Sequence, residues 1–139
     1  MDRVVKGIVI LASLVSVGFG VWHFFVPAIW NWYDFIMDSS GELVIAVRAI
    51  NVFFSASLVL FGLMNLAILY KNKANNYSRL VVLSASLLLW LLRVIMQLVF
   101  PQGSASGLLQ YSMLLIFITV FLCYVFSLIY FAKHKEKSC

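Results

Sequence analysis

Residues 108–132, LLQYSMLLIFITVFLCYVFSLIYFA, form an apolar run that contains no charged residue. A helix needs about 20 apolar residues to cross the hydrocarbon core of a bilayer, and this run exceeds that length. In lipid the backbone has to satisfy its own hydrogen bonds, which a helix does within a single segment. The alternation typical of a strand in a membrane β-barrel is absent. The run therefore predicts a transmembrane helix.

Three further apolar runs precede it, at about residues 4–26, 43–70 and 80–100. Hydrophobic residues make up 64% of the 139 residues and charged residues 11%. Soluble domains are about 45–50% apolar and about 25% charged, so a soluble protein of this size could not bury so much apolar surface. The prediction is an all-α membrane protein in which residues 1–139 form one integral domain with four transmembrane helices.

The basic residues that flank these runs fall on one side of the predicted bundle. They cluster at the start of the first run, between the second and third, and after the fourth, as Arg3, Lys6, Lys71, Lys73, Arg79, Lys133, Lys135 and Lys137. Cytoplasmic connections of membrane proteins carry such an excess of lysine and arginine. Because the connections are short, we expect an up-down-up-down bundle with both termini in the cytoplasm. The expected location is a plasma membrane, most simply the inner membrane of a bacterium.

The connection between the first two runs has its own pattern. Pro27 suits the first position of a helix, and aromatic residues fill most of the segment after it, WNWYDF at 30–35. Asp34 and Asp38 share one face with Asn31 at helical spacing. Aromatic side chains favour the membrane–water interface. We therefore predict a short interfacial helix at about residues 28–38, followed by a capping box from Ser39 that starts the second span.

Each run also carries one stripe of small or polar residues at helical spacing. In lipid, small residues let helices approach and polar residues bond between them, so these stripes should face the interior of the bundle. The stripes are Ser13, Ser16, Gly20 and His23; Arg48, Asn51, Ser55, Gly62 and Asn65; Ser86, Trp90, Arg93 and Gln97; and Ser112, Thr119, Cys123, Ser127 and Tyr130.

The candidate functional residues lie at one depth, near the outer end of the spans. Arg48 is about 9 Å along the second helix from Glu42, and Arg93 is about 10 Å before Phe100, at 1.5 Å per residue. A charged arginine at membrane depth costs about 2.5 kcal/mol or more unless it is paired or hydrated. The residues expected to converge there are Arg48, Arg93, His23, Asn51, Trp90 and Gln97.

Two interpretations of these arginines are open. In the first, Arg48 and Arg93 are structural: they pair with Asp34 or Asp38, bond to carbonyls, or reach up to lipid phosphates. In the second, they line an outward-facing pocket with His23 and the aromatic residues. Arginine binds phosphate and carboxylate groups through paired donors, and the aromatic residues would suit an apolar tail. The second interpretation predicts a lipid or another amphiphilic anion as the ligand.

Several classes of function find no support in the sequence. The net charge of +5 comes from residues that flank apolar runs, so no nucleic acid is expected as a partner. Cys123 and Cys139 form no CxxC pair. His23 lies near the outer end and His134 beyond the last span, so they cannot share a haem in one subunit. No metal site and no cofactor are therefore predicted.

Three functions remain as hypotheses. The first is a non-enzymatic protein of the lipid bilayer that binds a lipid-like anion or a partner membrane protein. The second is a small oligomeric transporter or channel that selects anionic solutes through Arg48 and Arg93. The third is a lipid-modifying membrane enzyme with His23 as its base. The lack of a nucleophile near His23 in the sequence favours a non-enzymatic role, and a homo-oligomer or a partner subunit is compatible with it.

Overall fold

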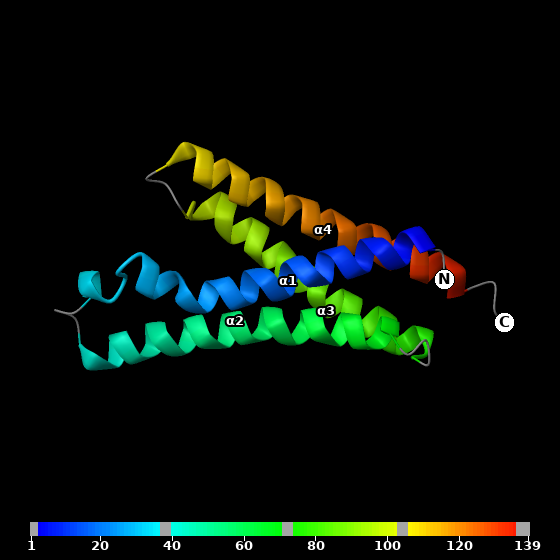
Figure 1. The fold of residues 1–139 in the computed structure, drawn as a ribbon, viewed down its shortest axis with the longest axis horizontal. Helices are drawn as coiled ribbons and strands as arrows, with labels where there is room; N and C mark the ends of the chain where they lie inside the picture. The colour runs from blue at the N-terminus through cyan, green and yellow to red at the C-terminus, as the bar shows by residue number, and fades with distance from the viewer. Residues whose placement is uncertain (1–2, 37–39, 71–73, 103–105, 136–139) are drawn as a thin grey trace.

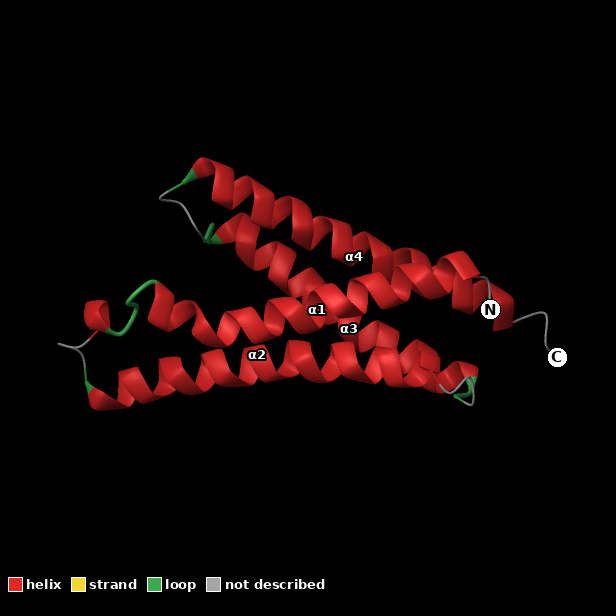
Figure 2. Cartoon of the chain, viewed as in Figure 1, coloured by secondary structure: helices red, strands yellow, loops and turns green. Residues whose placement is uncertain are grey.

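The computed structural model describes residues 3–36, 40–70, 74–102 and 106–135, with the backbone alone for residues 134 and 135. Four long helices, α1 (Arg3–Ile29), α2 (Gly41–Tyr70), α3 (Asn76–Val99) and α4 (Gly107–Lys135), account for most of it (Figures 1 and 2). All four are long and apolar enough to cross a membrane. The prediction of an all-α protein with four helices that could each span a membrane is confirmed.

The helix ends follow local sequence signals. The side chain of Asn75 caps α3 by accepting a hydrogen bond of 2.8 Å from the Ser78 backbone N–H. At the other end, Phe100 leaves the helical conformation because Pro101 disfavours it in the residue before. The helices extend a few residues beyond most of the predicted apolar runs, since a helix can continue past the membrane boundary.

The interfacial helix predicted at about 28–38 is not found in the described residues. Helix α1 continues through Pro27 to Ile29, and only a short 3-10 helix, η1 (Asp34–Ile36), follows. Residues 37 and 38 and the predicted cap at Ser39 lie outside the described residues. Asn31 ends α1 because it adopts a φ of 51°. The Trp32 N–H then reaches the Pro27 carbonyl at 2.9 Å, which is the Schellman arrangement.

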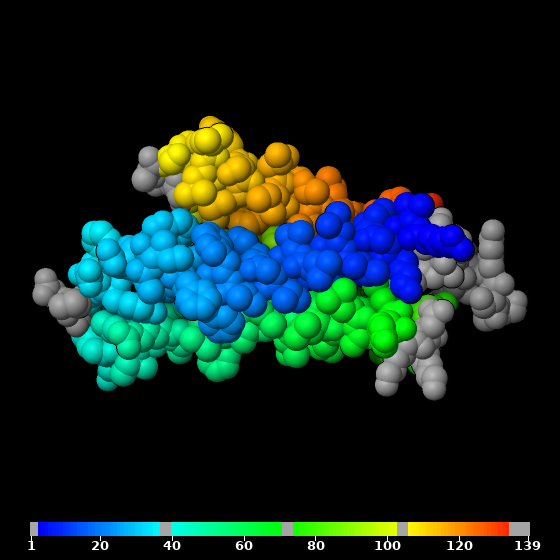
Figure 3. Space-filling model, in the orientation of Figure 1, coloured from blue at the N-terminus to red at the C-terminus, as the bar shows by residue number. Residues whose placement is uncertain are grey.

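The helices pack mainly as two pairs, α1 with α2 and α3 with α4. Figure 1 shows the start of α1 and the end of α4 at one end of the molecule, with the α1–α2 connection at the other. In Figure 3, α1 runs across the visible face between α2 and α4. Gly20 and Gly62 permit the close approach of α1 and α2, because a Cβ at Gly20 would lie 2.8 Å from the Ser55 carbonyl oxygen.

Polar side chains join the helices inside the bundle. Ser16 of α1 donates to the Ala12 carbonyl at 2.8 Å and accepts from the Trp90 indole N–H at 2.9 Å. Its hydroxyl proton is thus engaged, so the Tyr124 hydroxyl, 3.1 Å away, is the donor of their bond. On the other side, Asn65 donates to Ser86 at 2.7 Å. These bonds connect α1 to α3 and α4, and α2 to α3.

The predicted inward stripes are confirmed for α1 and α3, and for α2 with the exception of Arg48, which is exposed. The stripe of α4 is wrong in part, because Ser112 and Thr119 are exposed. Their hydroxyls donate to carbonyls of their own helix, at 2.9 Å and 2.8 Å, and so need no partner from another helix. The buried face of α4 is instead largely apolar and aromatic, with Met113, Phe117, Val120, Tyr124, Ser127 and Phe131.

Candidate functional site

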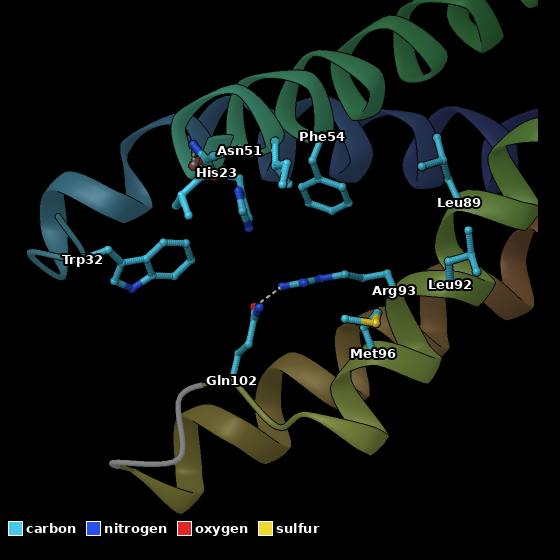
Figure 4. A pocket seen from close by; sticks show the side chains of 11 residues that line it. His23, Trp32, Asn51, Phe54, Leu89, Leu92, Arg93, Met96 and Gln102 are labelled. Atoms are coloured by element: carbon cyan, nitrogen blue, oxygen red, sulfur yellow. Dashed lines mark hydrogen bonds between the residues drawn. The ribbon is translucent and has the colours of Figure 1, made fainter. Parts of the chain in front are cut away.

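A pocket of about 360 Å³ lies between the two helix pairs, at the end where α1 finishes and α2 begins (Figure 4). Its wall combines α1, α2, α3 and the two segments that follow α1 and α3. The lining residues are His23, Trp32, Val47, Ile50, Asn51, Phe54, Leu89, Leu92, Arg93, Met96 and Gln102. Ile50, Leu92 and Met96 are also exposed on the outside. The pocket therefore opens sideways between α2 and α3.

Arg93 is the one charged residue among the described residues that line this pocket. It is only 7% exposed, and aromatic rings surround its guanidinium: the Cζ atom lies 4.7 Å from the ring centre of Phe117, 5.4 Å from Phe54 and 5.5 Å from Phe19. Such contacts stabilise a cation through the ring faces. Among the described residues, no carboxylate pairs with Arg93, and its buried Nε makes no hydrogen bond.

Gln102 provides the closest polar contact to Arg93. Its side-chain oxygen accepts a hydrogen bond of 2.6 Å from Arg93 Nη2. Gln97, one turn along α3 from Arg93, positions Gln102 by donating to its backbone carbonyl at 3.1 Å and accepting from its N–H at 3.4 Å. The neutral amide of Gln102 therefore occupies one donor of the guanidinium but leaves its charge without an anion.

In the opposite wall, Pro27 leaves a backbone carbonyl of α1 without its usual hydrogen bond. Proline has no N–H, so the His23 carbonyl lacks its usual partner within α1. Asn51 of α2 donates to that carbonyl at 3.3 Å. The His23 ring lies 4.9 Å from Phe54 and 6.5 Å from Trp32 between ring centres, and its Nδ1 is 3.4 Å from Ser55 Oγ. This arrangement turns the imidazole of His23 into the pocket (Figure 4).

The structure brings together part of the predicted set. His23, Asn51 and Arg93 line the pocket, whereas Gln97 supports it from behind through Gln102. Trp90 lies deeper, where it is 1% exposed and packs at 5.7 Å from Phe117 between ring centres. It therefore forms part of the floor beneath the aromatic cage of Arg93 and does not line the cavity.

Arg48 is separated from Arg93 in the structure. It is exposed, and its guanidinium lies 4.5 Å from the ring centre of Tyr33, in the connection after α1. Within the described part of the chain no carboxylate pairs with Arg48, so the expected pairing with Asp34 is not found. Asp38 lies outside the described residues. The long side chain of Arg48 reaches toward the surface near the N-terminal end of α2, as arginines near helix ends commonly do.

Sequence reasoning missed Gln102, Trp32 and the aromatic cage of Phe19, Phe54 and Phe117. The phenylalanines have no distinguishing signal, since apolar aromatic residues occur throughout the spans. Gln102 stands in the uncharged connection after Pro101, which reads as a polar turn. Only the packing of the four helices shows that Gln102 and the three phenylalanines meet at Arg93, and that Trp32 lines the same pocket.

A second hollow, of about 610 Å³, lies between α1 and α2 at the opposite end of the molecule. Over the residues that the structure describes, its wall is apolar apart from Lys6 and the hydroxyl of Tyr70, and it has no buried charged group. Among the described residues, no three His, Cys, Asp or Glu side chains come together as ligands of a metal ion. The pocket at Arg93 therefore combines buried polar groups with free volume, and the hollow at the opposite end does not.

Comparison with protein-family models, with curated proteins and with solved structures finds no match to this chain.

Proposed function

We propose that this chain is a non-enzymatic membrane protein that binds an amphiphilic monoanion, with its charged group at Arg93 and its apolar part in the lateral opening between α2 and α3. One observation carries the proposal: Arg93 is almost fully buried on the wall of an apolar pocket, and no carboxylate of the described residues neutralises it. A buried charge is destabilising unless it is paired. A bound anion would supply the missing partner.

The pocket limits the charge and the size of this ligand. Because Arg93 is the one charged residue among the described residues of the lining, a group with a single negative charge matches it. A carboxylate or a phosphodiester has that charge, and both accept paired bonds from guanidinium. At about 30 Å³ per water-sized group, the volume of about 360 Å³ holds the polar group and only the first part of a long chain. The remainder would extend into the lipid.

The proposed setting is an up-down-up-down bundle in a plasma membrane, with both termini in the cytoplasm and the pocket at the outer side. The basic clusters of the sequence support this orientation through the positive-inside rule. Segment 30–36, with Trp30 and Trp32 stacked 6.3 Å apart between ring centres, would lie at the outer interface. A homo-oligomer or a partner membrane protein is compatible with the lipid-facing surfaces.

Binding is favoured over the two alternative functions by specific contacts. For a channel, the two arginines would need to share a path, but Arg48 stacks on Tyr33 outside the pocket. Below the pocket, the fully buried side chains of Trp90, Phe117 and Tyr124 fill the centre of the bundle. An enzyme that uses His23 as a base would need a nucleophile beside it, and Ser55 has the adjacent hydroxyl. That hydroxyl donates its proton to the Asn51 carbonyl at 2.7 Å and so does not donate it to His23.

Replacing Arg93 with Gln should weaken the binding of dodecanoate about 10- to 100-fold. Hydrogen bonds to charged groups contribute about 1.5–3 kcal/mol, and 1.4 kcal/mol corresponds to about tenfold in affinity. The measurement is the binding of radiolabelled dodecanoate to the protein in phosphatidylcholine nanodiscs, corrected with empty nanodiscs.

Arg48→Gln is the matched control, because it removes the same charge from the same end of the bundle but outside the pocket. It should change the affinity by less than about twofold. Dodecanol, which has the same chain without the charge, should bind equally to the wild type and to Arg93→Gln. Equal losses in the two arginine variants, or no loss in Arg93→Gln, would contradict the proposed function.

The orientation leads to a separate labelling prediction. In a background without Cys123 and Cys139, we expect an impermeant maleimide to label Asp34→Cys in intact spheroplasts. Lys133→Cys should be labelled only after the membrane is permeabilised. Both native side chains are exposed, so accessibility to the reagent reports the side of the membrane. Labelling of Lys133→Cys in intact spheroplasts would show the opposite orientation.

A further inference from the structure

The hydrogen bonds around His23 determine which ring nitrogen carries its proton. Ser55 Oγ donates its single proton to the Asn51 carbonyl at 2.7 Å. It can therefore only accept from His23 Nδ1, which lies 3.4 Å away. The neutral imidazole thus carries its proton on Nδ1, and its Nε2 is a hydrogen-bond acceptor. No described residue donates to Nε2.

A second acceptor without a donor lies in the same wall. Asn51 is only 6% exposed, and its Nδ2 donates to the His23 carbonyl. Its Oδ1 is buried and completes no hydrogen bond among the described residues, although the Asn51 side chain lies within reach of the His23 ring. Exchanging the two ends of the amide would place this oxygen against a carbonyl oxygen, so the assignment follows from the contact. Buried acceptors without donors are destabilising, which makes this wall short of donors.

The wall formed by Arg93 has the opposite property, because it offers hydrogen-bond donors. Arg93 presents guanidinium N–H groups, of which one is engaged by Gln102. The two walls face each other across the same ring: the His23 ring centre lies 4.9 Å and the Arg93 Cζ atom 5.4 Å from the centre of Phe54. Figure 4 shows His23 and Arg93 on opposite sides of the cavity. A ligand held by Arg93 therefore brings its adjacent atoms close to the acceptors on the other wall.

From these two walls we infer that the ligand carries a hydroxyl group beside its anionic group, and that His23 Nε2 accepts the hydrogen bond from this hydroxyl. The inference rests on the proposed function, since Arg93 must first hold the anion. It narrows the ligand to hydroxylated amphiphilic monoanions. Two sources share this chemistry: a hydroxy fatty acid, and a monoacyl phosphodiester lipid whose head group bears hydroxyls.

The test compares ligand pairs that differ in the hydroxyl alone. For the carboxylate source, dodecanoate is compared with α-hydroxydodecanoate and β-hydroxydodecanoate in nanodiscs. For the phosphodiester source, monoacyl phosphatidylmethanol is compared with monoacyl phosphatidylglycerol. In one of these series the wild type should bind the hydroxylated ligand about 2- to 10-fold more tightly, as expected for one neutral hydrogen bond.

Two variants of His23 separate the role of Nε2 from a general effect on packing. In His23→Asn, the amide nitrogen can replace Nδ1 as the donor to Ser55, but no group replaces Nε2. This variant should bind both members of each pair with equal affinity. The comparison is made within the variant, so a change in its affinity for dodecanoate does not affect the result. Arg48→Gln, which lies outside the pocket, should keep the preference. In His23→Gln, the longer amide can place an oxygen near the position of Nε2, so part of the preference should remain.

Each outcome is decisive. A preference that His23→Asn abolishes supports the inference, and the series in which it occurs names the source. Equal affinity within every pair, or a preference that persists in His23→Asn, overturns it. If dodecanoate binding still depends on Arg93 in that case, the proposed function stands without the hydroxyl. If the dependence on Arg93 is also absent, both are wrong.

Discussion

Replacing Trp90 with Ala is expected to lower the free energy of unfolding by about 3–5 kcal/mol, the range for large buried aromatic residues. Trp90 is 1% exposed, and its ring lies 5.9 Å from Phe19 and 5.7 Å from Phe117 between centres. The truncation leaves a cavity between α1, α3 and α4. It also removes the indole N–H that donates to Ser16. Unfolding in mixed detergent micelles, followed by circular dichroism, measures the change.

A conservative variant separates the two effects of Trp90. Trp90→Phe keeps most of the ring volume but removes the hydrogen bond to Ser16, so we expect a loss of about 0.5–1.5 kcal/mol. Because Phe19 and Phe117 also surround Arg93, Trp90→Ala should weaken dodecanoate binding as well, whereas Trp90→Phe should leave it nearly unchanged. Equal stability of Trp90→Ala and the wild type would contradict the buried position of this side chain.

Replacing Gly62 with Leu is expected to destabilise the protein by about 3 kcal/mol, the upper part of the range for overpacked sites. Even a Cβ at this position would lie 2.7 Å from Val17 Cγ2 and 2.9 Å from the Ser13 carbonyl oxygen. The backbone of Ser13 cannot move without displacing α1, so α1 and α2 have to separate. The change is measured by the same unfolding experiment.

Gly18→Leu provides the matched control. Gly18 lies on α1 and would meet no atom within 4 Å of an added Cβ. The same substitution is therefore expected to change the free energy of unfolding by no more than about 0.5 kcal/mol, as for other exposed positions. If both variants were equally destabilised, the effect would come from the loss of glycine itself, and the close contact of α1 with α2 would not be its cause.

The separation of α1 from α2 should also affect the pocket. His23 and Asn51 meet across these two helices through the carbonyl that Pro27 leaves free. Gly20 lies one turn before His23. A Cβ added at Gly20 would lie only 2.8 Å from the Ser55 carbonyl oxygen, so the glycine allows α1 to approach α2 closely here. The same close packing that stabilises the α1–α2 pair therefore positions one wall of the site. The α3–α4 pair, with Arg93 and Phe117, positions the other.

The sequence by itself determined the membrane class, the number of helices and most of their inward faces. These follow from single-segment properties: the length of an apolar run, its lack of charges and the spacing of Ser16, Asn51 or Arg93 along one helix. Such properties are local because lipid imposes the same requirement on every span, namely an apolar surface and a backbone that bonds within its own helix. The stripe of α4 was wrong in part because a hydroxyl that bonds within its own helix is tolerated on either face. Ser112 and Thr119 are exposed, whereas Ser127, which bonds in the same way, is buried.

Only the tertiary structure decided which residues form the site. Arg48 and Arg93 look equivalent in the sequence, but one stacks on Tyr33 at the surface and the other lies buried among three phenylalanines. The end of α1 depended on Asn31 in a left-handed conformation, and so the expected helix after Pro27 did not form. The pocket exists because two helix pairs, each packed tightly within itself, meet at an end where no side chain of the described residues fills the space between them. That geometry depends on contacts between distant residues, which no single span encodes.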